Sequence, residues 1–132
     1  MSFLLDSDIC SAHLKQSGSL GSKLLQCTGR LYLSTVNLGE LYTWALRAGA
    51  PPSRLQSLVD FLNDVVILDV TEPIGRKFGE LRAGLLDLGQ PAPTLDLFIA
   101  ATALVHDLTL VTDNGPDFRN VSGLRIEDWL TA

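Results

Sequence analysis

The chain has 132 residues, a net charge of −5 and an apolar fraction of 46%. A chain of this length fits one domain, residues 1–132, which can bury roughly two-thirds of its unfolded surface. No apolar run approaches the ~18 residues of a membrane span, and the N-terminus lacks the basic segment of a signal peptide. Cys10 and Cys27 have no CxxC or paired-histidine spacing, so we expect reduced core thiols in a cytoplasmic protein rather than a zinc site or a disulfide.

In the first half of the chain, short apolar runs alternate with helical patterns. Asp6 directly follows the first of these runs. Asn37 has the place of a helix N-cap, and Glu40, three residues later, has the capping-box position. We expect a strand at 3–5, a helix at 7–16 that residues 17–19 break, a helix at 20–27, a strand at 30–34 and a helix at 37–48.

The second half of the chain continues this alternation. Gly89 ends a long helix there, and Thr94 can cap a following helix that is apolar nearly all round and therefore central. We expect a turn at 50–53, a helix after it, a strand at 65–70, the long helix, the apolar helix to His106, a strand at 109–111 and an edge strand at 125–126. In the helix after the turn, helical spacing predicts that the buried residues are Leu55, Leu58, Val59 and Leu62. In the long helix it predicts that they are Ile74, Phe78, Leu81, Leu85 and Leu88. The alternation predicts an α/β protein with a mainly parallel sheet and helices on both faces.

Four acidic residues lie where predicted strands give way to helices. They are Asp6, Glu40, Asp96 and Asp117. Because the carboxyl ends of parallel strands border one crevice of an open α/β sheet, we expect these side chains to converge. Neighbouring carboxylates repel one another and raise each other's pKa, and a bound divalent cation offsets that repulsion. Since Mg²⁺ and Mn²⁺ prefer oxygen ligands, the pattern predicts a site for one of these ions.

Such a site suits phosphodiester hydrolysis. A bound metal ion activates a water molecule and neutralises charge on the phosphate, so no Ser, Cys or His nucleophile is required. We expect His13 and His106 to be surface or packed residues. The net negative charge argues against a nucleic-acid partner, but that objection weakens if several acids bind cations. Each acid taken alone also has a structural alternative as a helix-capping or first-turn carboxylate.

Five segments carry a family resemblance that spans nearly the whole chain. They are Leu4 to Ile9, Ser34 to Leu41, Asp96 to Ala103, Leu110 to Phe118 and Gly123 to Trp129. In this order and spacing they resemble the PIN-domain ribonucleases, particularly the VapC-type toxins of bacterial and archaeal toxin-antitoxin pairs. The resemblance implies a PIN-like α/β/α sandwich and a metal-dependent endoribonuclease that uses Mg²⁺ or Mn²⁺ to hydrolyse RNA.

The resemblance also implies roles for individual residues. The four acids match the family's acidic quartet, with Asp6 and Asp96 as the principal metal ligands and Glu40 and Asp117 completing the site. Supporting polar positions of the family are matched by Thr112 and Asn114.

Two further acids complicate this match. Asp8 stands where the family usually has Asn, so it either adds charge to the site or faces solvent. Asp113 is a surplus acid beside Asn114, and we rank Asp117 above it as the fourth carboxylate.

Basic residues and an apolar surface indicate possible partners. Arg76, Lys77 and Arg82 on the long helix could hold RNA phosphates, although an ordinary solvated face with Arg76 and Glu80 as an i, i+4 pair is the alternative. The resemblance implies an RNA substrate, a small antitoxin that blocks the acidic crevice, a homodimer, DNA contact only through the antitoxin, and no membrane partner. The high apolar fraction is compatible with such interfaces.

Three other functions fit part of the pattern. The spacing of Asp6 and Asp8 also resembles the nucleophile motif of haloacid-dehalogenase-like phosphatases, which needs a later Lys, but no Lys follows Lys77. A receiver-like signalling module would need a Lys near the last strand, and this chain has none there. A non-cleaving, nucleic-acid-binding regulatory PIN-like domain is the third alternative, against which the intact acidic quartet argues.

Overall fold

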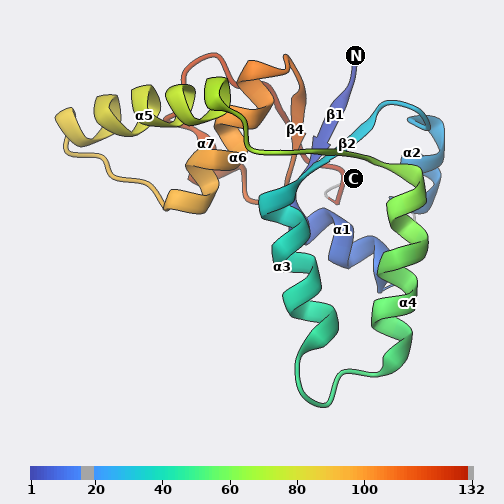
Figure 1. Cartoon of the computed structure of the whole chain (residues 1–132). Helices are drawn as coiled ribbons and strands as arrows, with labels where there is room; N and C mark the ends of the chain where they lie inside the picture. Colours follow the sequence, from blue (N-terminus) through green and yellow to red (C-terminus); the bar gives the residue numbers. More distant parts are fainter. Residues whose placement is uncertain (16–19, 131–132) are drawn as a thin grey trace.

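The computed structural model describes residues 1–15 and 20–130, and its strands form one five-stranded sheet in which every pairing is parallel (Figure 1). The strands are β1 (Phe3–Leu5), β2 (Leu31–Ser34), β3 (Val66–Leu68), β4 (Thr109–Val111) and β5 (Ile126–Glu127). Their order is β3-β2-β1-β4-β5, so the chain winds outward from β1 in one direction and then returns to the other side of it. The reversal falls between β1 and β4, where an open α/β sheet forms its binding crevice.

Helices cover both faces of this sheet, as the alternating sequence pattern predicts. They are α1 (Ser7–Leu14), α2 (Leu20–Gln26), α3 (Thr35–Leu46), α4 (Pro52–Phe61), α5 (Glu72–Asp87), α6 (Thr94–Val105) and α7 (Gly115–Phe118), with a 3-10 turn at Leu62–Asp64. In Figure 1, α3 and α4 run side by side away from the sheet, whereas α5, α6 and α7 lie together on its other side. The predicted fold class is therefore confirmed.

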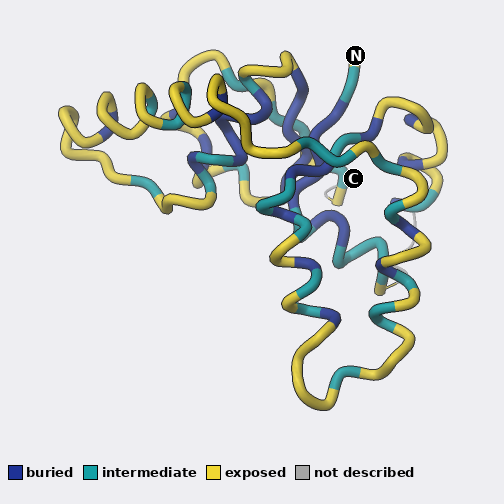
Figure 2. Tube along the Cα trace, viewed as in Figure 1, coloured by how far each residue is buried: buried dark blue, intermediate teal, exposed yellow. Residues whose placement is uncertain are grey.

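The two-residue period of the central strands divides the core into two clusters. Phe3 and Leu5 of β1 face one way and join the apolar residues of α1 to α4. Leu4 points to the opposite face, where it packs with residues of α5, α6 and α7. Figure 2 shows this buried centre, with exposed residues on the tip that joins α3 to α4 and along the outer side of α5.

The central helix α6 fits its apolar sequence. Six of its residues are buried, namely Leu97, Ile99, Ala100, Ala101, Thr102 and Ala103. Phe98 stacks on Phe78 of α5 with ring centroids 4.0 Å apart, and this contact fixes the two helices against each other. Gly89 ends α5 in a left-handed conformation, with φ of +69°, as expected of a glycine after a helix.

The structure also corrects several expectations about helix ends and faces. Ser34, not Asn37, caps α3, because the Ser34 side chain accepts a hydrogen bond from the Asn37 backbone N–H. Thr94 is the first residue of α6 and does not cap it; Pro93 precedes it and makes no capping hydrogen bond. The short helix α7 was not expected.

Val59 and Leu88 were expected to be buried but are 44% and 69% exposed. Val59 lies on the solvent side of α4, and Leu88 comes after the last residue of α5, where helical spacing no longer places it on the packed face. The predicted end of the first helix at residue 16 and the break at 17–19 lie outside the described residues. No described helix is long and apolar enough to cross a membrane. Cys10 and Cys27 are buried free thiols, as expected.

Candidate functional site

The reversal point of the sheet brings two distant residues together. Asp6 directly follows β1, and its backbone N–H donates to the Val111 carbonyl of β4 at 2.9 Å. Thr112 directly follows β4, and its hydroxyl donates to Oδ2 of Asp6 at 2.8 Å. Both side chains are buried, with Asp6 only 8% exposed. Adjacent parallel strands thus place a carboxylate and a hydroxyl, 106 positions apart in sequence, in direct contact.

The other oxygen of Asp6 is held by the start of α3. Asn37 is fully buried, and its Nδ2 donates to Oδ1 of Asp6 at 2.9 Å. Ser34 fixes this amide, because its hydroxyl donates to Oδ1 of Asn37 at 2.8 Å while accepting from the Asn37 backbone. The backbone N–H of Ser7 also donates to Asp6 Oδ1, at 2.8 Å. Burial raises the pKa of Asp6, and the hydrogen bonds from Thr112, Ser7 and Asn37 oppose that rise.

Glu40 lies one helical turn after Asn37 on the same side of α3. Its Oε1 accepts hydrogen bonds from the Ser7 hydroxyl at 3.1 Å and from Asn37 Nδ2 at 3.3 Å. The Asn37 amide therefore touches the carboxylates of both Asp6 and Glu40. Glu40 itself is exposed, so it lies at the rim of the site rather than in its floor.

Asp96 brings the remaining acids into the same site. It lies in the first turn of α6 and is half-buried. Burial raises the pKa of Asp96, and the charges of Asp6, Asp117 and Glu40 raise it further. Because the effect of one charge on another weakens with distance, these effects indicate that the four acids lie near one another, at the crevice that the reversal of the sheet forms, which we call the acidic cleft. Asp117, in α7, is exposed and accepts a hydrogen bond from Asn114 Nδ2.

The two surplus acids form a separate pair at the edge of this cleft. The Asp113 backbone N–H lies 3.4 Å from Oδ2 of Asp8, and the two side chains share a hydrogen bond. Burial, that hydrogen bond and the charges of Asp6 and Asp113 raise the pKa of Asp8. Asp8 is therefore near the site but is turned toward Asp113, and its Oδ1 accepts from the Ile9 backbone.

The donor set fits a hydrated divalent cation better than a closed metal cage. Within residues 1–15 and 20–130, no group of three or more Asp, Glu, His or Cys side chains is arranged to hold a metal ion by itself. Mg²⁺, however, usually takes one or two carboxylates and keeps several waters. Oδ2 of Asp6 accepts only the Thr112 hydroxyl, which leaves a lone pair, and Asp96 accepts no side-chain hydrogen bond from the described residues.

The basic residues singled out on α5 behave differently from one another. Arg76 and Lys77 both pair with Glu80, at 3.2 Å each, on an exposed face of the helix. Arg82 makes no ion pair within the described chain. The Arg76–Glu80 pair of the solvated-face alternative is therefore present, and Arg82 is exposed on the same helix without an ion pair.

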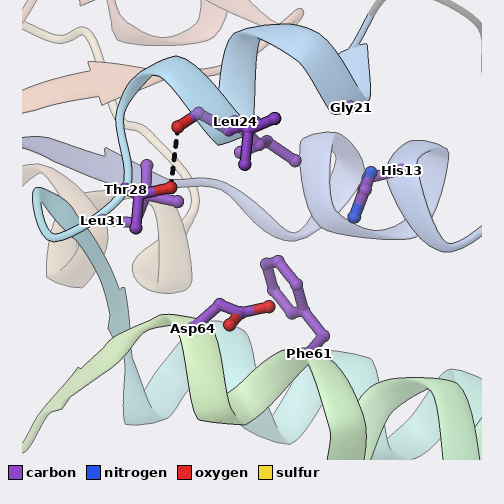
Figure 3. Close-up of a pocket in the computed structure, with 8 residues that line it drawn as sticks. His13, Gly21, Leu24, Thr28, Leu31, Phe61 and Asp64 are labelled. Atoms are coloured by element: carbon purple, nitrogen blue, oxygen red, sulfur yellow. Dashed lines mark hydrogen bonds between the residues drawn. The ribbon is translucent and has the colours of Figure 1, made fainter.

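A hollow of about 330 Å³ lies between α1, α2 and α4, away from the acidic cleft (Figure 3). His13 borders it, with its ring centroid 5.5 Å from that of Phe61, and Asp64 lies on the facing side. Burial lowers the pKa of His13, and the charge of Asp64 opposes that shift. His13 is therefore a partly packed residue, as expected, and it is not among the residues around the four acids.

Sequence reasoning missed three residues of the polar network. Ser7, Ser34 and Asn37 were not proposed as site residues, although each hydrogen-bonds to a site carboxylate or to the amide that does so. The available signal was the spacing of Asn37 and Glu40, which places both on one side of a helix that starts at the end of a strand.

Comparisons with known proteins identify the family and agree with the fold. A family model described as the PIN domain matches residues 3–124. The chain is 32% identical over 130 residues to the tRNA(fMet)-specific endonuclease VapC of Shigella flexneri, with 98% of each chain covered. It is 30% identical over 131 residues to ribonuclease VapC2 of Haemophilus influenzae, with 98% of this chain and 99% of the relative covered. The fold is similar to a structure of DNA-bound VapBC from Salmonella typhimurium, with a TM-score of 0.91, 30% identity and 98% of both chains covered. It is also similar to VapBC2 from Rickettsia felis bound to a promoter DNA fragment, with a TM-score of 0.90, 27% identity and coverage of 98% and 99%.

Proposed function

We propose that this chain, which belongs to the PIN domain family and is of the VapC type, is a metal-dependent endoribonuclease that hydrolyses RNA phosphodiester bonds. The observation that carries the proposal is the convergence of four carboxylates, one directly after β1 and the others from α3, α6 and α7, whose charges act on Asp96. The ribonuclease and endonuclease names of relatives that align with nearly the whole chain support the reaction class.

We propose Mg²⁺ or Mn²⁺ as the metal ion and Asp6 and Asp96 as the residues that hold it. Such an ion lowers the pKa of a bound water and neutralises charge on the phosphate oxygens. The chain's own contribution is to fix the ligands in advance: Thr112 and Asn37 together hold both oxygens of Asp6. Carboxylates that bind metal ions in other proteins are likewise held by hydrogen bonds from neighbouring groups.

The exposed acids have a different role in the proposal. Glu40 uses Oε1 to accept from Ser7 and Asn37, which leaves Oε2 without a hydrogen-bond donor among the described residues. That oxygen can accept a proton from the attacking water at the rim of the cleft. Asp117, oriented by Asn114, would add negative charge to the site that holds the ion.

We further propose that the protein is the toxin of a toxin-antitoxin pair and acts in the cytoplasm. Structures similar to this chain are VapBC complexes, two of them with DNA, so a small antitoxin is the proposed protein partner and the proposed link to DNA. Exposed apolar side chains such as Leu25, Leu46 and Leu88 offer surface that an antitoxin or a second copy in a homodimer would cover.

The test is RNA cleavage by the purified protein, free of antitoxin, in Mg²⁺, in Mn²⁺ and in EDTA. We expect internal cleavage with either metal, none in EDTA, and none for Asp96→Asn. Asp87→Asn is the matched control, because Asp87 is an exposed acid at the end of α5 and lies outside the cleft. Equal cleavage by Asp96→Asn would refute the proposal. So would cleavage in EDTA by protein that has been freed of contaminating nuclease.

A further inference from the structure

Few basic side chains of this acidic protein remain free to meet a phosphate. Arg76 and Lys77 pair with Glu80, Arg125 pairs with Asp107, and three others lie over aromatic rings. Within residues 1–15 and 20–130, the basic side chains with no ion pair, hydrogen bond or ring contact are Lys15, Arg47, Arg82 and Arg119.

One of these free side chains lies directly beside the acidic cleft. Arg119 follows α7 and lines a hollow of about 200 Å³ together with Asp117. The opposite wall of this hollow is the loop of Pro91, Ala92 and Pro93, which leads into α6 and toward Asp96. A positively charged side chain in this place would contact a substrate strand that passes into or out of the acidic cleft.

Arg82 lies on the other side of the same loop. It borders a smaller hollow, of about 80 Å³, which shares Leu85, Pro91 and Ala92 with the first one. The two hollows therefore adjoin across the loop, with one free arginine in each. Because the ring of proline fixes φ, Pro91 and Pro93 keep the loop between the two hollows stiff.

We propose that Arg119 and Arg82 bind successive backbone phosphates of a single-stranded RNA that runs from the acidic cleft along the loop of Pro91 to Pro93. This inference rests on the proposed ribonuclease function and deepens it by placing one part of the substrate. A guanidinium binds phosphate through two parallel N–H donors, which suits an exposed arginine that has no carboxylate partner.

The negative charge of the cleft repels RNA, and arginines beside the cleft would offset that repulsion. A net charge of −5 repels RNA, and the four acids concentrate that charge where the strand must bend into the site. Phosphate contacts supply most of the sequence-independent affinity for nucleic acid. Arginines just outside the carboxylates would hold the flanking phosphates while the metal ion offsets the charge at the centre.

The experiment measures binding of a fluorescent single-stranded RNA in EDTA, by anisotropy over a range of salt concentrations. Arg82→Gln and Arg119→Gln are compared with the wild type and with Arg47→Gln. Arg47 is an equally free, exposed arginine, but it lies after the far end of α3 from Asn37. For single strands, each lost phosphate contact should reduce the slope of log K against log salt by about 0.7. We expect that reduction in each of the two variants and an unchanged slope in Arg47→Gln.

Cleavage in Mg²⁺ gives a second measurement. Both variants should raise KM and leave kcat near the wild-type value, because they remove an interaction that ground state and transition state share. Wild-type slopes in both variants, a slope that falls equally in Arg47→Gln, or no RNA binding by the wild type would overturn the subsite. RNA binding with the expected slopes but no cleavage in any metal would instead refute the proposed nuclease and leave the subsite standing.

Discussion

The two sides of the acidic cleft are built in opposite ways. On the side of β1 and α3, Asp6 is buried and accepts hydrogen bonds from Ser7, Asn37 and Thr112. On the side of α6 and α7, Asp96 has no hydrogen-bond donor among the described residues, and its pKa is raised by burial and by three other acids. The carboxylate on one side is held by hydrogen bonds, and the carboxylate on the other side has no hydrogen bond from the described residues to offset its charge.

The contrast between the two sides shows how a small chain can prepare a cation site before the ion binds. The buried network fixes one ligand without the ion, as buried polar groups must be hydrogen-bonded to be tolerated. The second carboxylate stays destabilised until a cation arrives, so binding the cation relieves repulsion that the folded protein already contains. Substitutions on the two sides of the cleft should therefore have different effects.

Asp6→Asn should have the largest effect, with cleavage falling below detection. An Asn side chain would present an amide N–H to Thr112 or Asn37, both of which donate to Asp6, so the network and the metal ligand would be lost together. Asp117→Asn should lose less activity, because Asp117 is exposed and has only Asn114 as a partner. Single-turnover cleavage of one RNA by both variants checks the order, and an equal loss would remove the distinction between the two sides.

Asn37→Ala should weaken metal binding by about 10- to 100-fold, the usual cost of removing a residue that orients a metal ligand. It should also lower the free energy of unfolding by about 1–3 kcal/mol, since Asp6 Oδ1 and the Ser34 hydroxyl lose a buried partner. Calorimetric titration with Mn²⁺ and urea unfolding measure the two effects. Thr43→Ala is the control in the same helix, because that exposed hydroxyl bonds only to the Gly39 carbonyl. Wild-type Mn²⁺ affinity in Asn37→Ala would contradict the proposed role of the network.

Asp96→Asn should raise the melting temperature of the metal-free protein at neutral pH. A group whose pKa is raised by folding stabilises the protein at low pH, and that contribution is lost as the pH rises through the folded-state pKa. The wild type therefore carries a repulsive charge near pH 7 that the variant lacks, and the gap should close in acid. Thermal melts in EDTA at several pH values test this. A variant that melts lower than the wild type at neutral pH would show that Asp96 is not under repulsion.

Asp8→Asn should have the smallest effect, with RNA cleavage unchanged. Asp8 is turned toward Asp113, and an Asn amide can donate to that carboxylate without taking up a proton. Folding raises the pKa of Asp8, so the metal-free wild type should lose stability as the pH rises through that pKa, and the variant should lose less. Cleavage rates and the pH dependence of urea unfolding check both statements. A large loss of cleavage would place Asp8 in the site after all.

The strands and most helices could be predicted because they depend on local patterns. The alternation of Phe3, Leu4 and Leu5 between two faces follows from strand geometry, and Gly89 ends α5 as its freedom at positive φ allows. The convergence of the acids also followed from the parallel sheet. Local rules failed where a residue had a distant partner: Asn37 looked like a helix cap, but its amide is used by Asp6, 31 positions away.

Burial was harder to predict at the ends and edges of helices. Val59 and Leu88 fit the apolar spacing, yet both are exposed in the folded protein, and only the tertiary arrangement reveals that. Arg119 gave no signal in the sequence, because its significance comes from the hollow that α7 and the proline loop form together. Side-chain networks and hollows between elements can thus be found only in the three-dimensional structure, whereas strand ends can be found in the sequence.

The most direct measurement is the position of Mn²⁺ in crystals of the antitoxin-free protein, located by its anomalous scattering. The account predicts a peak between Asp6 and Asp96, with the Thr112 and Asn37 hydrogen bonds to Asp6 intact, and no peak in crystals of Asp96→Asn. A peak at Asp8 and Asp113 instead, or an undiminished peak in the variant, would contradict the claim that the two unlike sides of the cleft together bind the ion.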